Sequence, residues 1–245
     1  MAEPLEWIEP DWPAPRRIGA LVSTRRGGIS VGSFASLNLG TRVGDDPRAV
    51  AENRARVRAA LPAEPVWLRQ VHGLDVVDAA RAEADATADA AFTRAAGCVC
   101  TIQVADCLPV LFCDRDGTTV AAAHAGWRGL SAGVLERAVA TLEAPPDTLL
   151  AWLGPAIGPT AFEVGMDVFE AFTATDPQAA DAFRPLRAGK WLADLYALAR
   201  RRLARVGVHA VYGGGLCTLS DPARFFSYRR DRVTGRQAAF IWLRA

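Results

Sequence analysis

Residues 97–125, GCVCTIQVADCLPVLFCDRDGTTVAAAHA, decide how this chain folds. Three runs within them, Gly97–Val104, Pro109–Cys113 and Thr119–Ala125, are apolar at most positions, which predicts strands buried on both faces. Asp114–Gly117 has the polar, glycine-containing composition of a turn. The stretch therefore predicts strands from the interior of a covered β-sheet.

On either side of this stretch, periodicity and turn residues predict further elements. Asp46 is the expected N-cap of a helix whose first turn contains Pro47. The alanine-rich stretch Ala79–Ala91 is interpreted as a surface connection that leads into a strand. The predicted strands are Ile18–Ser23, Pro65–Val71, Asp75–Asp78, Thr148–Leu153, Val208–Tyr212 and Gln237–Leu243, and the predicted helices are Pro47 to about Leu61, about Leu130 to Leu142, Met166–Thr173 and Asp194–Arg205.

These elements interleave without an even strand–helix–strand rhythm and without a glycine-rich dinucleotide fingerprint. The expected fold class is therefore α+β (mixed α/β), a layered sandwich rather than a Rossmann domain. We expect one domain over residues 1–245, because no linker or repeat divides the chain.

Composition excludes several classes of protein. The chain has 245 residues, of which 51% are hydrophobic, so it can bury a large core and is not disordered. Its net charge of +1 argues against a dedicated nucleic-acid binder. Because Lys190 is the only lysine, a Schiff-base mechanism would depend on that one residue.

The sequence also predicts the compartment. No run of about 18 apolar residues is present, so we expect no membrane-spanning helix. Residues 1–15 are rich in acidic residues and proline rather than carrying a basic segment and an apolar run, so they do not resemble a signal peptide. The five cysteines are odd in number and lie mostly in apolar runs, which indicates reduced thiols in a cytoplasmic protein.

Three segments place reactive side chains where predicted buried strands end beside a glycine or proline. They are Gln70–Gly73, Ala105–Pro109 and His124–Gly129. Two imidazoles (His72, His124) and one thiolate (Cys107) make a suitable zinc set, and three protein ligands leave the fourth tetrahedral position for a water whose pKa falls to about 7. Each residue alone is more often an inert core residue. The chain has three histidines, and two of them lie at such strand ends together with Cys107. This joint placement favours a functional metal site over three inert core residues.

Other polar residues are weaker candidates for binding. Gly126–Gly129 marks a helix start, where free N–H groups attract anions, and Arg128 could add a charge-assisted contact. Arg54 lies on a predicted helix among other arginines, so the simplest expectation is that its side chain is exposed to solvent. Asn38 lies in a loop between leucines. The basic run Tyr228–Arg232 could bind phosphate or a partner subunit, but exposed hairpin charge is its simplest interpretation. We assign His209 no role.

The same segments identify the chain as resembling a known family. It is similar to the YfiH-like, laccase-domain family, whose members are also described as polyphenol oxidases, purine nucleoside phosphorylases and peptidoglycan editing factors. The matching stretches are Thr24–Ser30, Leu37–Leu39, Val43–Asp46, Asn53–Arg54, Gln70–Gly73, Ala105–Pro109, His124–Gly129, Gly154–Pro159, Phe162–Gly165 and Phe226–Asp231. Leu192–Leu195 fits the family pattern only loosely.

The resemblance implies a YfiH-like layered sandwich with mixed β-sheets flanked by helices. It implies Zn²⁺ bound by His72, Cys107 and His124, which would also be the catalytic residues. The implied activities are phosphorolysis of adenosine, inosine, guanosine and methylthioadenosine, and deamination of adenosine. For these reactions we expect Asn38, Arg54 and Arg128 to bind substrate. Asp106 is a neighbouring proton carrier that strand alternation would turn away from Cys107.

Several alternatives stay open. A laccase needs a trinuclear copper cluster besides a His₂Cys copper, and three histidines cannot supply both centres. A single Cu²⁺ in the one site is chemically possible, which leaves a single-copper polyphenol oxidase as an alternative. A second is a Cys–His hydrolase or amidase that edits cytoplasmic peptidoglycan precursors with Cys107 as nucleophile. A third is a structural zinc beside a partner-binding surface. The expected partners are small molecules, with no nucleic acid or membrane, in a monomer or weak homodimer.

Overall fold

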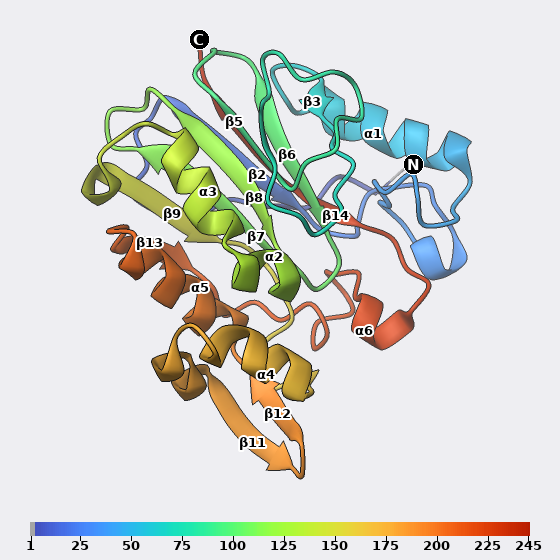
Figure 1. Ribbon diagram of the computed structural model, residues 1–245. Helices are drawn as coiled ribbons and strands as arrows, with labels where there is room; N and C mark the ends of the chain where they lie inside the picture. Colours follow the sequence, from blue (N-terminus) through green and yellow to red (C-terminus); the bar gives the residue numbers. More distant parts are fainter. Residues whose placement is uncertain (1–2) are drawn as a thin grey trace.

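Two β-sheets packed face to face form the centre of the protein in the computed structural model, which describes residues 3–245 (Figure 1). The first sheet has the order β1 (Trp7–Ile8), β2 (Ile18–Ser23), β14 (Gln237–Leu243), β6 (Val99–Val104) and β3 (Pro65–Val66). The second has the order β13 (Ala210–Gly213), β9 (Leu149–Leu153), β7 (Leu108–Asp114), β8 (Val120–Ala125), β5 (Ala90–Thr93) and β4 (Val76–Asp78). Both sheets mix parallel and antiparallel pairs.

The central strands are buried on both faces, as their apolar runs predict. In β7, Val110 and Phe112 point into the core beneath the helices, whereas Leu111 and Cys113 point into the core between the two sheets. Every residue of β7, β8 and β14 is buried. Successive side chains of a strand point to opposite faces of the sheet, so each central strand contributes side chains to two separate cores.

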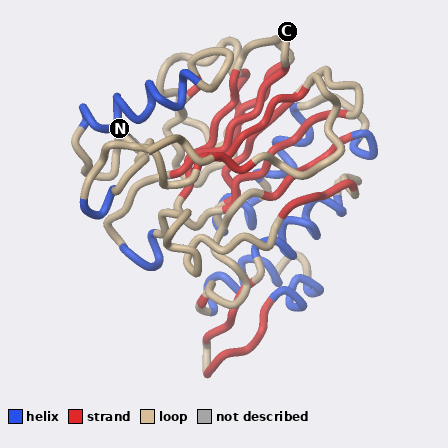
Figure 2. Tube along the Cα trace, turned by 180° about the vertical axis from the view of Figure 1, so that it is seen from behind, coloured by secondary structure: helices blue, strands red, loops and turns tan. Residues whose placement is uncertain are grey.

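Helices cover the outer face of each sheet, which gives four layers (Figures 1 and 2). α1 (Pro47–Ala59) packs on the first sheet through Val57, close to Phe240 and Trp242 of β14. α2 (Trp127–Ala132), α3 (Val134–Thr141) and α5 (Leu195–Arg205) pack on the second sheet. The mixed α/β layered sandwich expected from the sequence is confirmed.

Helix ends follow the capping residues in the sequence. Asp46 accepts a hydrogen bond from the backbone N–H of Arg48, and Asp194 accepts one from that of Ala197, so each carboxylate starts its helix. The helix expected over Leu130–Leu142 is wrong in extent. It begins earlier, at Trp127, and Gly133 divides it, because its φ of 107° is a left-handed conformation that a continuous helix excludes.

Two other expectations near the site need correction. The strand expected over Pro65–Val71 ends at Val66, because the chain leaves the sheet and turns through His72, whose φ is 61°. The stretch Ala79–Ala91 is more than a surface connection. Its last residues are fully buried, Ala90 and Ala91 begin β5, and Asp89 precedes them with no exposed surface.

A small third sheet projects from the body at the lower end of Figure 1 and was not expected from the sequence. It consists of β10 (Glu163–Val164), β12 (Lys190–Ala193) and β11 (Phe183–Arg187), beside α4 (Met166–Thr173). The basic run at residues 228–232 is not a hairpin, because it forms the short helix α6 (Tyr228–Asp231). Three 3-10 helices complete the elements of the described part of the chain, at Gly32–Phe34, Pro146–Thr148 and Pro177–Ala182. Within residues 3–245, no helix has the length and apolar character needed to cross a membrane.

Candidate metal centre

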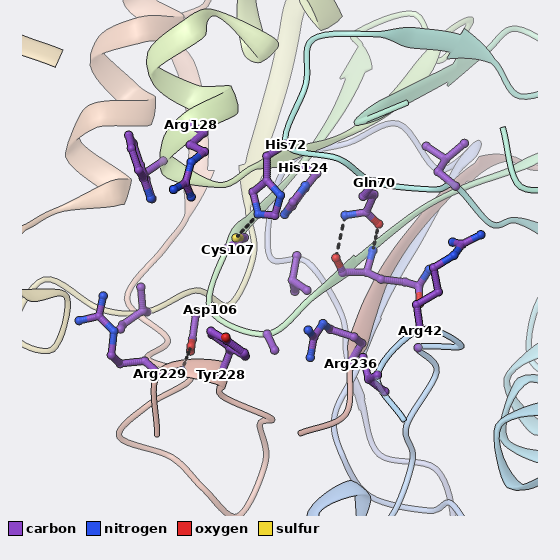
Figure 3. A pocket seen from close by; sticks show the side chains of 18 of the residues that line it. Arg42, Gln70, His72, Asp106, Cys107, His124, Arg128, Tyr228, Arg229 and Arg236 are labelled. Atoms are coloured by element: carbon purple, nitrogen blue, oxygen red, sulfur yellow. Dashed lines mark hydrogen bonds between the residues drawn. The ribbon is translucent and has the colours of Figure 1, made fainter. Parts of the chain in front are cut away.

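His72, Cys107 and His124 meet at one end of the second sheet, where their three donor atoms all lie within 4.8 Å of one another (Figure 3). Cys107 immediately precedes β7, and His124 lies near the end of β8, opposite Pro109 in the antiparallel ladder. His72 comes from the loop between β3 and β4. The strand register therefore brings Cys107 and His124 together, and the loop adds the third donor.

The distances fit a single metal ion. Cys107 Sγ lies 3.7 Å from His72 Nε2, and the two imidazole rings are 4.7 Å apart at their centroids. A tetrahedral zinc with bonds of about 2.3 Å to sulfur and about 2.0 Å to nitrogen would separate these donors by about 3.5 Å. One thiolate and two imidazoles are ligands that both Zn²⁺ and copper accept.

Asp89 holds both histidines in place. One carboxylate oxygen, Oδ1, lies 2.8 Å from His124 Nδ1 and accepts a hydrogen bond from the backbone N–H of His72 at 2.9 Å. The other, Oδ2, accepts from the N–H groups of Val71 at 3.0 Å and Gly73 at 2.6 Å. Because a carboxylate can only accept, Nδ1 of His124 carries a proton, so Nε2 is the ring nitrogen that would bind a metal ion.

The charges within the cluster support one another. Burial alone would raise the pKa of the Cys107 thiol, but the imidazoles of His124 and His72 lower it to about 6. Burial would lower the pKa of His124, but the Cys107 thiolate and the Asp89 carboxylate raise it to about 9. The Asp89 carboxylate keeps a lowered pKa despite its burial, because His124 and the N–H groups bond to its charged form. The thiolate needed for metal binding is therefore stable at neutral pH.

Because Gly126 has no side chain, it leaves room for the side chains of Cys107 and His72. A Cβ atom at this position would lie 2.8 Å from Cys107 Sγ and 3.0 Å from His72 Cδ2, which is closer than such contacts allow. The glycine between β8 and α2, which sequence analysis treated as a strand terminator, is thus required by close approach of two donor side chains.

A cavity of about 560 Å³ opens beside the three donors. Its walls carry five arginines, Arg42, Arg128, Arg229, Arg232 and Arg236. In Figure 3, Arg128 and Arg236 extend into the space beside the cluster from different parts of the chain. Within the described residues, Asp106 is the one carboxylate on these walls. The cavity is therefore strongly positive and suits an anionic ligand beside the cluster.

The Asp106 carboxylate points away from the cluster, but strand alternation is not the reason, because Asp106 and Cys107 lie in the turn between β6 and β7 and Asp106 has a φ of 93°. Its Oδ1 accepts a hydrogen bond from Thr218 Oγ1 at 2.6 Å, and its Oδ2 accepts from the backbone N–H of Arg229 at 2.6 Å. Both oxygens thus bind the C-terminal segment to the site (Figure 3). This carboxylate anchors the wall of the cavity and is poorly placed to carry protons for a reaction at Cys107.

The three expected substrate-binding residues lie in different places. Arg128 lines the cavity, with its guanidinium 4.4 Å from the ring centre of Trp127. Arg54 lines a neighbouring cavity instead. Asn38 is fully buried and lines neither cavity. Its amide is occupied by the backbone of Gly40, by Asp45 and by the N–H of Arg236, so it fixes the Arg236 segment.

Sequence reasoning missed Asp89 and four of the five cavity arginines. Asp89 could have been suspected from its position directly before the apolar run Ala90–Phe92, where a charged residue needs a partner. Arg229 and Arg232 belong to the basic run that was noticed and set aside. Arg42 and Arg236 carry no local signal, because only the tertiary fold brings their loops to the cavity.

Comparison with known proteins places the chain in a family. A family model described as "Multi-copper polyphenol oxidoreductase laccase" matches residues 19–244. A Pseudomonas aeruginosa protein named a purine nucleoside phosphorylase is 58% identical over 97% of this chain and 98% of its own length. The Escherichia coli protein named "Purine nucleoside phosphorylase YfiH" is 56% identical over 96% of this chain and 98% of its own length.

Solved structures are similar over nearly the whole chain. A crystal structure of a Neisseria meningitidis protein has a TM-score of 0.95 at 52% identity and covers 98% of this chain and 99% of that one. The crystal structure of YlmD from Geobacillus stearothermophilus has a TM-score of 0.90 at 34% identity and covers 98% of this chain and 96% of that one.

Proposed function

Because the chain belongs to the multi-copper polyphenol oxidoreductase laccase family, in which the relatives above are named purine nucleoside phosphorylases, we propose that it is a zinc-dependent purine nucleoside phosphorylase. The expected substrates are adenosine, inosine, guanosine and methylthioadenosine. One observation carries the proposal: the three converging donors stand beside a cavity whose walls are rich in arginine.

His72, Cys107 and His124 are the residues that would hold the ion. Three protein donors would leave a bound ion free to take a further ligand. A bound Zn²⁺ would supply Lewis acidity at that place. The family description names copper, but a chain with three histidines, of which His209 is exposed and lies in another part of the fold, does not hold the ligands of a trinuclear cluster.

Phosphorolysis suits the charge of the cavity. Inorganic phosphate attacks the anomeric carbon of the ribose, the bond from that carbon to the purine nitrogen breaks, and the purine leaves with the electron pair and takes up a proton. The products are the free purine and ribose 1-phosphate. The task of the protein is to hold a dianion against a sugar carbon that becomes positive, and Arg128, Arg229 and Arg236 supply that charge.

Deamination of adenosine at the same centre is the weaker part of the proposal. That reaction replaces the amino group at C6 with oxygen from water and releases ammonia, so a proton must pass from the water to the leaving group. The carboxylate of Asp106 is engaged by Thr218 and Arg229. We therefore expect phosphorolysis to dominate when phosphate is present.

A second candidate rests on the alignment of Asp89, His124 and Cys107. Asp89 bonds His124 Nδ1, and the opposite ring nitrogen faces the Cys107 thiol, which is the order of a cysteine hydrolase. This alignment supports the chemistry of a cysteine hydrolase or amidase, and a peptidoglycan precursor is the substrate that the family resemblance suggests for it. Such an enzyme would keep its activity after chelation and lose it to a thiol alkylator.

The proposal is tested by identifying products. Protein of known metal content is incubated with adenosine, with and without inorganic phosphate, and the products are identified by mass. Adenine and ribose 1-phosphate, formed only with phosphate, are the expected result. Inosine as the sole product would make the protein a deaminase, and unchanged adenosine in both samples would reject the nucleoside activity.

A further inference from the structure

Gln70 joins the loop that carries His72 to the first sheet. Its side-chain nitrogen Nε2 donates a hydrogen bond to the backbone carbonyl of Gln103 at 2.9 Å, and its side-chain oxygen Oε1 accepts one from the backbone N–H of Gln103 at 2.8 Å (Figure 3). Gln103 belongs to β6, beyond the point where the neighbouring strand β3 ends at Val66. One side-chain amide therefore pairs with the backbone of β6 as a residue of a neighbouring strand would.

Two of the three separations within the candidate metal centre are fixed by contacts described above. The ladder of β7 and β8 sets Cys107 relative to His124. Asp89 sets His72 relative to His124, because its carboxylate bonds to the backbone N–H of the first and to the ring of the second. The separation of His72 from Cys107 needs a contact of its own.

The pair of hydrogen bonds between Gln70 and Gln103 supplies that contact. Gln70 lies two residues before His72, and Gln103 lies four residues before Cys107. The two hydrogen bonds thus connect the segments that carry these two donors. In the structure, His72 Nε2 lies 3.7 Å from Cys107 Sγ, which suits two ligands of one ion.

His72 is the donor whose position depends most on such a contact. Its side chain is exposed, whereas that of His124 is buried within β8. It lies in the loop between β3 and β4, and its φ of 61° is a left-handed conformation that residues other than glycine rarely adopt. Such a conformation persists where surrounding contacts hold it.

We propose that Gln70 is a positioning residue of the metal centre, which holds the His72 imidazole at the distance from the Cys107 thiolate that lets one ion bind both. This inference rests on the metal centre of the proposed function. When the hydrogen bonds to Gln103 are absent, the loop samples other positions. Metal binding must then order the loop as well, so the affinity for the metal falls.

Zinc affinity measures this role without turnover. The full chain and its Gln70→Leu variant, both stripped of metal, are titrated with Zn²⁺ in competition with a chromophoric chelator. Leucine is similar to glutamine in size but forms no side-chain hydrogen bond, so we expect the affinity to fall about tenfold. Gln70→Asn keeps the amide but is one methylene shorter, so it should also bind zinc more weakly than the unmodified protein.

The matched control is Gln103→Leu. It removes the same kind of amide from the wall of the same cavity. The backbone N–H and carbonyl of residue 103, which are the groups that bind Gln70, remain in this variant. It should therefore keep the zinc affinity of the unmodified protein.

A double-mutant cycle shows whether the effect passes through His72. The His72→Ala variant keeps two protein donors, so its weaker zinc binding is measured against a weaker chelator. Adding Gln70→Leu to this variant should change its zinc affinity by less than about twofold, because the donor that Gln70 positions is already absent. A general structural role of Gln70 would instead lower the affinity in both backgrounds by the same factor.

Three results would overturn the inference. Unchanged zinc affinity in folded Gln70→Leu and Gln70→Asn would show that the loop needs no such contact. An equal loss in Gln103→Leu would assign the effect to the cavity wall, and an equal loss in the His72→Ala background would remove His72 from the explanation. Failure of the unmodified protein to bind zinc would reject the metal centre of the proposed function as well, whereas the other results leave that centre intact.

Discussion

Asp89 Oδ1 lies 2.8 Å from Nδ1 of His124, so a fully buried carboxylate fixes a histidine that belongs to the candidate metal centre. The same carboxylate accepts three consecutive backbone N–H groups, from Val71, His72 and Gly73. Register explains the contact, because Ala90 of β5 pairs with Ala123 of β8 and their neighbours therefore adjoin. A single side chain thus orients two of the three donors.

Replacing Asp89 with asparagine should weaken metal binding while the fold persists. An asparagine amide would place an N–H donor against backbone and imidazole groups that also donate. It would also remove the negative charge that stabilises protonated His124 and the hydrogen bond that orients its ring. We expect zinc affinity to fall about 10- to 100-fold, measured by competition with a chromophoric chelator. The free energy of unfolding should fall by about 1–3 kcal/mol.

Asp114→Asn is the matched control for this change. Asp114 is also buried and bonds the backbone N–H groups of Thr118 and Thr119, but it lies at the opposite end of β7 from Cys107. This variant should lose stability and keep its zinc affinity. Equal loss of zinc affinity in both variants would contradict a specific role for Asp89.

Gly126→Ala should disrupt the centre by volume alone. Its Cβ would overlap Cys107 Sγ at 2.8 Å, so the thiol or the His72 ring must move away from the metal position. We expect bound zinc, measured by atomic emission, to fall well below one equivalent. Gly73→Ala is the comparison, because a Cβ there meets its nearest atom at 3.4 Å, and this variant should keep its zinc.

Arg128→Gln should impair the use of phosphate more than the use of nucleoside. Its guanidinium lines the cavity beside the three donors and has no ion-pair partner among the described residues. Its charge is therefore available to the phosphate. We expect the KM for phosphate to rise about tenfold or more in initial-rate assays. Arg137→Gln, at an exposed position of α3, should leave it unchanged. An increase confined to the nucleoside KM would assign Arg128 to the nucleoside instead.

Stability should decline at alkaline pH because of Cys113. Burial raises the pKa of this thiol to about 12, whereas in the unfolded chain it is about 8.5. Between these values the unfolded chain has lost the proton that the folded chain keeps, so the free energy of unfolding falls as pH rises. One such group contributes a slope of about 1.4 kcal/mol per pH unit.

Urea unfolding at several pH values between 8.5 and 11 measures this slope. Cys113→Ala should be less stable at pH 7, because a side chain with no exposed surface is truncated, but its stability should decline less steeply with pH. Parallel curves for the two proteins would show that Cys113 does not cause the decline.

Long apolar runs made much of the fold predictable. The bounds of β2, β14 and α4 agree with the expected ranges residue by residue, because an uninterrupted apolar run or a helical period marks each of them. The short strands β10, β11 and β12 were not predictable, because two to five residues carry too little period and β11 is exposed along most of its length. Gly133 was visible, but its left-handed conformation was not.

The candidate centre shows the same division. Cys107 directly precedes β7 and His124 lies near the end of β8, and Gly and Pro residues mark these strand ends, so their convergence follows from local patterns together with the ladder of β7 and β8. Asp89 acts through tertiary contacts with a separate loop, and the backbone of Arg236 is held beside the cavity by a hydrogen bond to Asn38 from the distant N-terminal part of the chain. Such long-range contacts leave no periodic trace in a single sequence.

Metal content and turnover of Cys107→Ala test the central claim most directly. Purified wild-type protein and the variant are assayed for zinc and for phosphorolysis of inosine, before chelation, after it, and after zinc is returned. The account predicts about one zinc per wild-type chain, activity that disappears on chelation and returns with zinc, and neither metal nor activity in the folded variant. A variant that retains full zinc and full turnover would contradict it.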